Sequence, residues 1–448
     1  MKILMAGAGL ANLSAAYHLK LGQAGQLECR IFEQGNRVGG LCRTVLKDGF
    51  AFDLTGHLLH FRTDYCRELV TALLGDNLRR LERKAWVYSH GRYIRYPFQA
   101  NLHGLPPEIV RECVKGFMEA DRRHGGVTPG ELLEMSFKEW VTGRFGRGIA
   151  RHFMIPYNRK LWTVDPGELT CDWMGRYVPC PTVEEVIAGA AGENVRQYGY
   201  NAHFWYPLKG GIQSLSDALA QGAGDIRLNK EVVCVDLSSK TIEFQDGDGA
   251  DYEILVSAIP LKKMIGLCRG VPEGLKKAAS GLRYASVLDI NLGIDRAKIS
   301  EKHWIYFPEG RFVFYRVGFP MNFSPYVCPP GSSSVYVEVA LTPGNSVDEE
   351  DTARVAVDQL VETGLLRNRK EVVVTHIQRI PFAYAIYDQH RRRAVPALLS
   401  FLREYSVYSI GRYGAWEYSA MEDALLAGRN VAREIVASRL VSRGSRAA

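Results

Sequence analysis

The segment Lys2-Ile3-Leu4-Met5-Ala6-Gly7-Ala8-Gly9 decides the fold of this 448-residue chain. Its first five residues read as a short buried strand, and an apolar helical pattern runs from Leu10 to Leu21 behind the glycines. Residues 28–33, Glu-Cys-Arg-Ile-Phe-Glu, form a second strand that ends on the acidic Glu33. A strand, a glycine turn, a helix and a second strand in this order predict a βαβ unit that binds a dinucleotide.

Gly7 and Gly9 supply the first two glycines of the G-x-G-x-x-G pattern, and Asn12 stands where the third would be. The first glycine permits the turn, and the second lets backbone N–H groups reach a pyrophosphate at the helix N-terminus. Asn12 is expected to weaken only the packing of the helix on the strand. Glu33 comes 24 residues after Gly9, a spacing that suits a hydrogen bond to a ribose hydroxyl.

The residues that follow Glu33 favour FAD over NAD as the dinucleotide. Arg37, Gly39, Gly40 and Arg43 come next, so the text reads Glu-x(5)-Gly-Gly with a following Arg. This pattern resembles the FAD-binding start of the amine-oxidase-like flavoproteins. The alternative is an ordinary turn between a strand and a loop.

The segment Asp53-Leu54-Thr55-Gly56-His57 is expected to approach the flavin. A glycine at position 56 allows the backbone to come close to the isoalloxazine ring. His57 has an ordinary pKa near neutrality, so its imidazole is expected to respond to the charge of the flavin. The alternative for His57 is a hydrogen-bonded structural histidine.

The composition is that of an ordinary globular protein, with 46% hydrophobic and 23% charged residues. The chain is too long for one core, so two or three domains are expected. The net charge of +7 permits an acidic ligand, but the basic residues are scattered, which argues against a nucleic-acid partner. The cluster Arg391-Arg392-Arg393 is interpreted as a solvated loop or helix face.

The nine cysteines are dispersed and include no C-x-x-C pair, so neither a zinc site nor a disulfide framework is expected, and no metal is predicted. Reduced thiols favour a cytoplasmic location. The chain opens on a strand pattern rather than a signal peptide, and it contains no apolar run long enough to span a bilayer. We therefore expect no membrane insertion.

The remaining sequence alternates between strand-rich and helix-rich stretches. It predicts an α/β fold with a FAD-binding Rossmann-like domain, an inserted helical domain, and a second domain built on a mixed or antiparallel sheet. The chain is expected to leave the first domain and return to it. The FAD-binding domain is expected to comprise residues 1–85, 210–262 and 404–442. The helical insertion is expected at 104–198, and the substrate-binding sheet domain at 86–103, 199–209 and 263–403.

Three separated runs mix aromatic rings with amide or guanidinium groups, which is not a routine core pattern. They are Tyr96-Pro97-Phe98-Gln99, the segment from Phe153 to Trp162, and Phe314-Tyr315-Arg316. Aromatic rings stack on flat ligands, and guanidinium groups bind anions bidentately. Together with the dinucleotide signature, these runs predict a flavin held opposite a flat, anionic ligand such as a sugar attached to a nucleoside diphosphate.

At these residues the chain resembles the UDP-galactopyranose mutase family, particularly its longer eukaryotic-type branch. The match is ordered and covers most of the chain, although Thr55 replaces the first glycine of the family's Gly-Gly-His loop. The matching stretches are Tyr96 to Asn101, Phe153 to Trp162, Trp173-Met174-Gly175-Arg176, Asn201 to Pro207 with Gly210-Gly211, Tyr306-Phe307-Pro308, Phe314-Tyr315-Arg316 and Gly411 to Tyr418.

The resemblance implies a role for each matching residue. The residues implied to be catalytic are His57, Arg176 and Arg316. The residues expected to bind FAD are Gly7, Gly9, Glu33, Gly39, Gly40, Arg43, Gly56, Val233, Gly411, Arg412 and Asp423. The residues implied to bind substrate are Tyr96, Gln99, Phe153, Asn158, Trp162, Asn201, Tyr306, Tyr384 and Tyr418.

The resemblance implies that Arg176 and Arg316 bind the diphosphate through charge-assisted hydrogen bonds, and that several tyrosine hydroxyls donate to the same phosphates. Gln99 and Phe153 hold a uracil by amide pairing and stacking. Each residue also has a plain structural alternative. Phe153 and Trp162 are equally at home in a core, and Arg316 in an interior ion pair.

The resemblance implies a flavin-dependent mutase that interconverts the pyranose and furanose forms of a nucleotide sugar, UDP-galactose-like, through a reduced-flavin N5–sugar adduct. It implies FAD active in its reduced form and an external reductant, with NADPH as one possibility; a homo-oligomer is left open. The alternative is an FAD-dependent oxidoreductase of the amine-oxidase or protoporphyrinogen-oxidase type. A non-catalytic FAD-binding protein fits least, because the His57 loop is intact.

The chain departs from the family near its C-terminus. It reads Ser419-Ala420-Met421-Glu422-Asp423 where the family carries an Asn and an Asp-His pair, and Ile386 to His390 lacks the family's Pro-Thr-Pro-Thr text. Asp423 is expected to cap the last helix beside the flavin. These departures leave the identity of the sugar and the source of electrons open.

Overall fold

The computed structural model describes residues 1–22, 27–123, 128–193 and 202–444. Its first sheet is parallel, with the strand order β20-β13-β1-β2-β9. The strands are β1 (Lys2–Ala6), β2 (Glu28–Phe32), β9 (Asp225–Arg227), β13 (Ile254–Ser257) and β20 (Val407–Ser409). Segments from the start, middle and end of the chain therefore meet in one sheet, as the returning strand patterns predicted.

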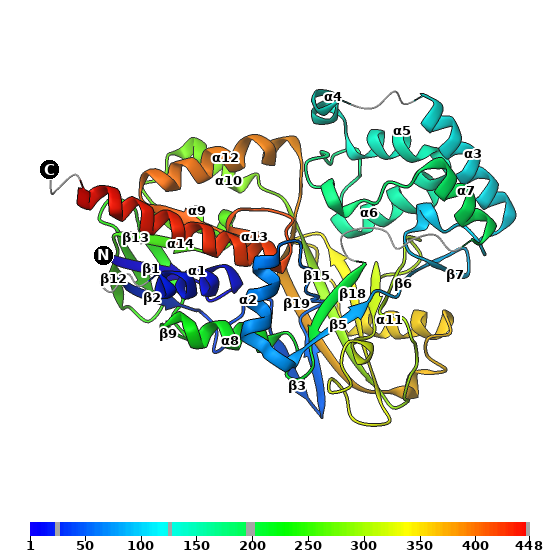
Figure 1. Cartoon of the computed structure of the whole chain (residues 1–448), viewed down its shortest axis with the longest axis horizontal. Coiled ribbons are helices and arrows are strands. Elements are labelled where there is room, and N and C mark those ends of the chain that lie inside the picture. The colour runs from blue at the N-terminus through cyan, green and yellow to red at the C-terminus, as the bar shows by residue number, and fades with distance from the viewer. Residues whose placement is uncertain (23–26, 124–127, 194–201, 445–448) are drawn as a thin grey trace.

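Helices cover this sheet, and Figure 1 shows several of them running beside β1 and β2. Helix α1 (Leu10–Leu21) packs on both α8 (Gln213–Ala223) and α14 (Met421–Gly444). Gly428 makes the α1–α14 contact possible, because a Cβ there would come within 2.6 Å of the Ala15 nitrogen. The remaining helices of this part are α2 (Asp64–Leu74), α9 (Leu261–Leu267), α10 (Glu273–Ser280), α12 (Gln389–Glu404) and α13 (Gly411–Gly414).

A four-stranded sheet and two two-stranded pairs are separate from the first sheet. The four strands, in the order β12-β11-β10-β14, are Gly249–Asp251, Thr241–Phe244, Val232–Asp236 and Cys268–Arg269. The pairs are β3 (Thr44–Lys47) with β4 (Phe50–Asp53), and β5 (Leu78–Glu82) with β8 (His203–Pro207).

The second large sheet has seven strands in the order β19-β15-β18-β17-β16-β6-β7. All its pairings are antiparallel except β16 with β6. Helix α11 (Glu349–Glu362) follows β18 along the chain. The strands are β6 (Ala85–Ser89), β7 (Arg92–Arg95), β15 (Tyr284–Ile294), β16 (Trp304–Tyr306), β17 (Arg316–Gly318), β18 (Ser333–Leu341) and β19 (Val372–Ala385).

Strands β15 and β18 are buried along almost their whole length, yet each carries one acidic side chain. Asp289 and Glu338 are both 0% exposed, and they lie directly opposite each other in the β15–β18 register. A buried carboxyl group needs hydrogen-bond donors or a counter-charge. The donors that this pair of carboxyl groups requires are described with the cavity below.

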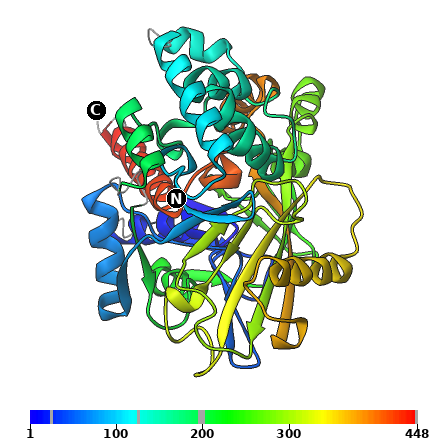
Figure 2. The same cartoon turned by 90° about the vertical axis from the view of Figure 1, so that its right-hand side faces the viewer.

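The helical part lies above the seven-stranded sheet in the turned view of Figure 2. A short π-helical stretch, Ala150–Met154, joins α5 to α6. Ser136 and Glu139 form a capping box that starts α5. The α-helices are α3 (Pro107–Arg123), α4 (Pro129–Glu134), α5 (Phe137–Ile149), α6 (Ile155–Trp162) and α7 (Val183–Ala191).

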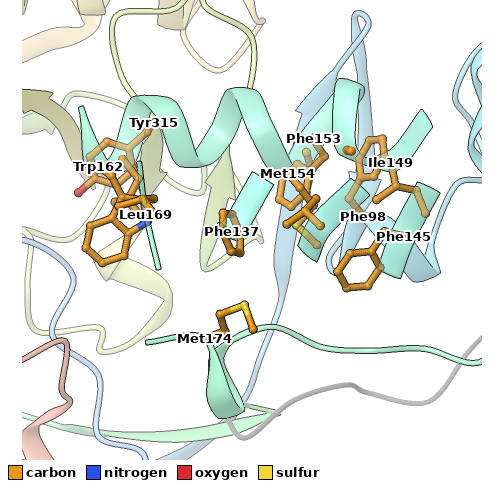
Figure 3. Packing of buried hydrophobic residues seen from close by; sticks show 14 of the residues in the cluster. Phe98, Phe137, Phe145, Ile149, Phe153, Met154, Trp162, Leu169, Met174 and Tyr315 are labelled. Carbon is orange, nitrogen blue, oxygen red and sulfur yellow. The ribbon is translucent and has the colours of Figure 1, made fainter. Parts of the chain in front are cut away.

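This helical part has a core of aromatic rings that extends down to the second sheet (Figure 3). Phe137, Phe145 and Trp162 are 0% exposed, and Tyr315 of the sheet part joins them in the same cluster. Glycines let α3 and α5 approach closely, because a Cβ at Gly148 would come within 2.7 Å of the Cys113 backbone. The packing fixes α6, which contributes cavity residues, against the sheet.

The predicted α/β fold class is confirmed, including its helical insertion and second sheet. The proposed domain boundaries remain an interpretation. The arginine cluster is not simply solvated: the Arg391 guanidinium lies 3.8 Å from the centre of the Tyr387 ring and donates to the Trp416 carbonyl, and Arg392 pairs with Asp172. Among the described residues, no helix combines the length and the apolarity needed to cross a bilayer.

Candidate active site

One large cavity, of about 850 Å³, lies where the parallel sheet, the helical part and the seven-stranded sheet meet. Most of the residues predicted for cofactor and substrate line it. They are Gly7, Gly9, Glu33, Gly39, Gly40, Arg43, Gly56, His57, Tyr96, Gln99, Phe153, Asn158, Tyr306, Arg316, Tyr384, Gly411, Arg412 and Tyr418.

Glycines form the narrow end of the cavity beside β1. Gly9 and Gly39 pair as an isolated bridge, and a Cβ at Gly40 would come within 3.3 Å of the Gly9 Cα. Gly411 has a φ of +75°, and a Cβ there would come within 2.7 Å of Ala11. The start of α1, at Gly9, Leu10 and Ala11, lines the cavity here. The first N–H groups of a helix have no partner within the helix, so this position suits a pyrophosphate.

Glu33 lies at the end of β2, next to these glycines. Its carboxylate accepts hydrogen bonds from the backbone N–H of Ala8, at 2.8 Å, and of Gly35, at 2.9 Å. The side chain is only 9% exposed and is held in place at the cavity wall. It is therefore fixed where a ribose hydroxyl would donate to it, and the residues present fit a dinucleotide cofactor.

Asn12 has more than the weakening role expected from the sequence. It is fully buried, and its side-chain amide donates to the carbonyls of Ala6, Gly7 and Val256 at 3.0, 2.8 and 3.3 Å. The amide therefore ties α1 to β1 and β13, and replaces the third glycine's close packing with hydrogen bonds.

The loop from Thr55 to His57 reaches the middle of the cavity. Thr55 has a φ of +68°, and its N–H donates to Asp289 at 2.9 Å, while the next N–H, of Gly56, donates to Glu338 at 3.2 Å. A Cβ at Gly56 would overlap the Tyr336 side chain, so only glycine fits. Two buried carboxyl groups thus hold two consecutive N–H groups and fix a loop that carries a strained residue.

His57 is neutral at pH 7, contrary to the expectation of a titration near neutrality. Burial and the nearby Arg412 lower the pKa of His57 to about 4. Its Nδ1 is buried without a hydrogen-bond partner among the described residues. His57 lines the cavity, and an unpaired buried ring nitrogen at such a place suits a hydrogen bond to a ligand or cofactor.

Arg316 belongs both to an ion pair and to the cavity wall. The interior ion pair that the sequence offered as the alternative is present, and the role in binding a diphosphate stays a prediction. Its Nε and Nη2 donate to Glu338 at 2.7 and 2.6 Å, and the carboxylate raises the pKa of Arg316 well above its usual range despite burial. Within the part of the chain that the structure describes, Nη1 makes no hydrogen bond. One edge of the guanidinium is thus anchored and the other is left for an anion.

Tyrosine rings surround Arg316. Tyr306 lies 5.0 Å from Tyr96 and 5.3 Å from Tyr157, and Tyr384 lies 5.9 Å from Tyr418, between ring centres. Burial raises the pKa of Tyr306 and Tyr384, which keeps both hydroxyls protonated as donors. Arg412 adds a second cation to this group, 5.3 Å from the Tyr384 ring and 5.1 Å from the Tyr418 ring.

Another part of the cavity wall carries stacked aromatic rings and the Gln99 amide. Phe153 lies between Phe98 and Tyr157, with centres 5.1 and 5.4 Å away and planes within 10° of parallel. Gln99 donates from Nε2 to the Pro179 carbonyl at 2.6 Å, and its Oε1 is buried without a partner among the described residues. This oxygen can accept from a flat ligand that carries an N–H.

Several predicted residues have other surroundings. Trp162 is fully buried and donates to Asn158 at 3.2 Å, so it supports the wall rather than lining it. Val233 is 40% exposed and only its neighbours line the cavity. Asp423 accepts from the Ala420 N–H at 2.7 Å at the start of α14 and pairs with Arg62, at a smaller hollow. Asn201 and the side chain of Arg176 lie outside the described residues.

The sequence did not single out Asp289, Tyr336 or Glu338, all of which surround the loop and Arg316. The sequence Val335-Tyr336-Val337-Glu338-Val339 could have indicated Glu338, because a single charged residue interrupts an apolar strand pattern there. Tyr157 also lines the cavity, within a run that was quoted but not assigned a role.

Residues 10–436 match the family model of flavin containing amine oxidoreductases, so this chain belongs to that family. Its cofactor is FAD, as the pattern from Glu33 to Arg43 predicted. Within the family, its structure is similar to that of reduced UDP-galactopyranose mutase, with a TM-score of 0.90 and 27% identity over 97% of this chain and 94% of the other. The chain is thus a UDP-galactopyranose mutase-like flavoenzyme, and the recognition from sequence is confirmed.

Other relatives carry names of oxidative enzymes. A protoporphyrinogen oxidase structure from Exiguobacterium shares the fold, with a TM-score of 0.73, 15% identity and coverage of 97% and 98%. Coproporphyrinogen III oxidase of Mycobacterium leprae is 31% identical over 65% of this chain and 66% of its own length. 4,4'-Diapolycopene oxygenase of Methylomonas is 25% identical over 66% and 63%. The chain thus spans a little under two thirds of these two curated relatives.

Proposed function

We propose that this enzyme interconverts the pyranose and furanose forms of a nucleoside-diphosphate sugar, and that a uridine nucleotide carries the sugar. The single observation that carries the proposal is Arg316, whose guanidinium is anchored through Nε and Nη2 and which lines the same cavity as the flavin-facing loop. The structural similarity to reduced UDP-galactopyranose mutase supports the same conclusion.

The base end of the cavity suits uracil. Phe153 lines this part of the cavity within a stack of aromatic rings, and the unpaired Oε1 of Gln99 offers an acceptor for an imide N–H. Because Gln99 donates to the Pro179 carbonyl, its amide orientation is fixed. A base that presents a lone pair there instead of an N–H would leave Oε1 unsatisfied, which costs about 1–3 kcal/mol.

The reduced flavin supplies the nucleophilic nitrogen of the reaction when it is bound. The protein keeps the departing diphosphate close to the anomeric carbon, which is the task we assign to Arg316, Arg176 and the hydroxyls of the tyrosine wall. His57, neutral at pH 7, is placed by its loop to offer or accept a hydrogen bond without adding charge.

Because the reduced flavin is the form that supplies the nucleophile, the flavin must be reduced before turnover begins, and because the reaction is redox-neutral overall, one reduction would serve many turnovers. An external reductant is therefore part of the proposal, and NADPH is one candidate. A homo-oligomer remains compatible with it.

An oxidoreductase is the second candidate, because the curated relatives named above are oxidative enzymes. It predicts net oxidation of the substrate, consumption of an electron acceptor, and activity that starts from the oxidised flavin. A large apolar substrate would remove water from Arg316 and from the tyrosine hydroxyls without offering them hydrogen bonds. This desolvation would oppose its binding.

The test incubates the protein with UDP-galactopyranose and other UDP, dTDP and GDP hexoses, anaerobically, with and without dithionite. Liquid chromatography then separates the pyranose and furanose forms. Isomer formation with a UDP sugar that requires dithionite supports the proposal. Oxygen uptake with an amine, a porphyrinogen or a polyene, together with no isomer formation, favours the oxidoreductase.

A further inference from the structure

Asp289 and Glu338 form a pair of fully buried carboxyl groups behind the flavin-facing loop. They face each other across β15 and β18, and neighbouring side chains at directly opposed positions in an antiparallel pair come close enough to interact. Each accepts one of the two consecutive N–H groups of Thr55 and Gly56. Arg316 is bonded to only one of the two, Glu338.

Asp289 lacks the compensation that Glu338 has. The Thr55 N–H and the Asn291 amide both donate to its Oδ2, the latter at 2.7 Å, while its Oδ1 is buried without a partner among the described residues. Burial, then the charge of Glu338, raise the pKa of Asp289 to about 8. A proton on Oδ1 would remove this charge and let that oxygen act as a donor.

The groups around Asp289 come from two neighbouring strands, from β17 and from the flavin-facing loop. Glu338 and Tyr336 come from β18, Arg316 from β17 and the loop N–H from Thr55. On β19 the register partner is Gln378, which is uncharged. Arg316 is thus the one cation among these neighbours, and Glu338 already neutralises it.

Given the diphosphate role proposed for Arg316, on which this step rests, we propose that Asp289 is a positioning residue that holds the single proton of this carboxyl pair. It fixes the flavin-facing loop through Thr55 and couples anion binding at Arg316 to proton uptake. When a diphosphate shares the guanidinium, Glu338 is less compensated, and the local field favours a proton on Asp289. Binding above pH 8 therefore takes up a proton from solvent, and binding at pH 6 does not.

The experiment compares wild-type holoenzyme with Asp289→Asn, which keeps an acceptor for Thr55 but cannot ionise. The control is Asp295→Asn, which removes a charge at an exposed position just beyond the same strand. Calorimetric titration with UDP at pH 8.5, in two buffers of different ionisation enthalpy, gives the number of protons taken up. We expect roughly half a proton or more for the wild type and the control, and none for Asp289→Asn. At pH 6.5 all three should bind UDP within threefold.

The flavin midpoint potential, measured between pH 6 and 9.5, is a second readout that requires no sugar substrate. The wild type should show a break near pH 8 that Asp289→Asn lacks. No proton uptake by the wild type at pH 8.5, or equal uptake by Asp289→Asn, overturns the coupling. If UDP does not bind the wild type at all, the proposed function fails, while the break in potential still decides whether Asp289 carries the proton.

Discussion

Replacing Arg316 by alanine should separate its structural role from its ligand role. The change removes two charge-assisted bonds, of 2.7 and 2.6 Å, and strands Glu338, which is 0% exposed. Breaking a buried ion pair by removing one partner costs about 3–5 kcal/mol of folding free energy. If the diphosphate loses two charge-assisted contacts, each worth about 1.5–3 kcal/mol, its dissociation constant rises about 10²–10⁴-fold.

The matched control is the double variant Arg316→Ala/Glu338→Gln. It removes the stranded charge, so we expect it to recover about 2 kcal/mol or more of the stability lost by the single variant. It restores no guanidinium, so UDP affinity should stay as weak as in Arg316→Ala. Urea unfolding followed by flavin fluorescence measures the first quantity, and calorimetric titration with UDP measures the second. Bound flavin per protein shows that the fold is intact.

Two results would refute this reasoning. If Arg316→Ala binds UDP within threefold of the wild type, the guanidinium does not contact the ligand. If the double variant regains UDP affinity along with stability, the loss in the single variant came from the stranded carboxylate rather than from a missing contact.

Two further predictions concern the amide proposed to contact the base and the flavin-facing loop. Gln99→Leu removes the unpaired Oε1, so UDP should bind about 5–100-fold more weakly, while inorganic pyrophosphate should inhibit turnover as before; equal losses for both ligands would contradict a base contact. Gly56→Ala places a Cβ within 2.7 Å of the Tyr336 ring carbon Cζ, so it should shift the flavin absorbance spectrum and abolish turnover. Adding Tyr336→Leu should restore the spectrum, because the shorter side chain makes room; a normal spectrum in Gly56→Ala alone would contradict the packing.

The part of the site that depends on local sequence could be predicted. Gly7, Gly9 and Glu33 are close in sequence, and the geometry of one βαβ unit fixes their spacing. The same holds for the run that carries Phe153 and Asn158, since the π-helical stretch continues directly into α6 and the two residues are only five positions apart. A pattern along the chain is enough for features of this kind.

The part of the site that depends on pairing between strands could not be predicted from the sequence. Asp289 and Glu338 lie 49 positions apart, and only the β15–β18 register brings them opposite each other and under the Thr55 loop. Trp162 shows a second limit of prediction from sequence, which concerns the orientation of a helix. It lies on the same short helix as Asn158, but the sequence cannot tell which of them faces the cavity and which the core.

The central claim is that the bond between the sugar and the diphosphate breaks while the diphosphate stays in the site. Positional isotope exchange tests it directly, with UDP-galactopyranose that carries ¹⁸O in the bridge between the anomeric carbon and the β-phosphorus. With dithionite-reduced enzyme, we predict that ¹⁸O recovered in unreacted substrate scrambles into the non-bridging β-phosphate positions, whereas the oxidised enzyme leaves it in the bridge. Isomer formation by the reduced enzyme with every ¹⁸O still in the bridge would contradict the account.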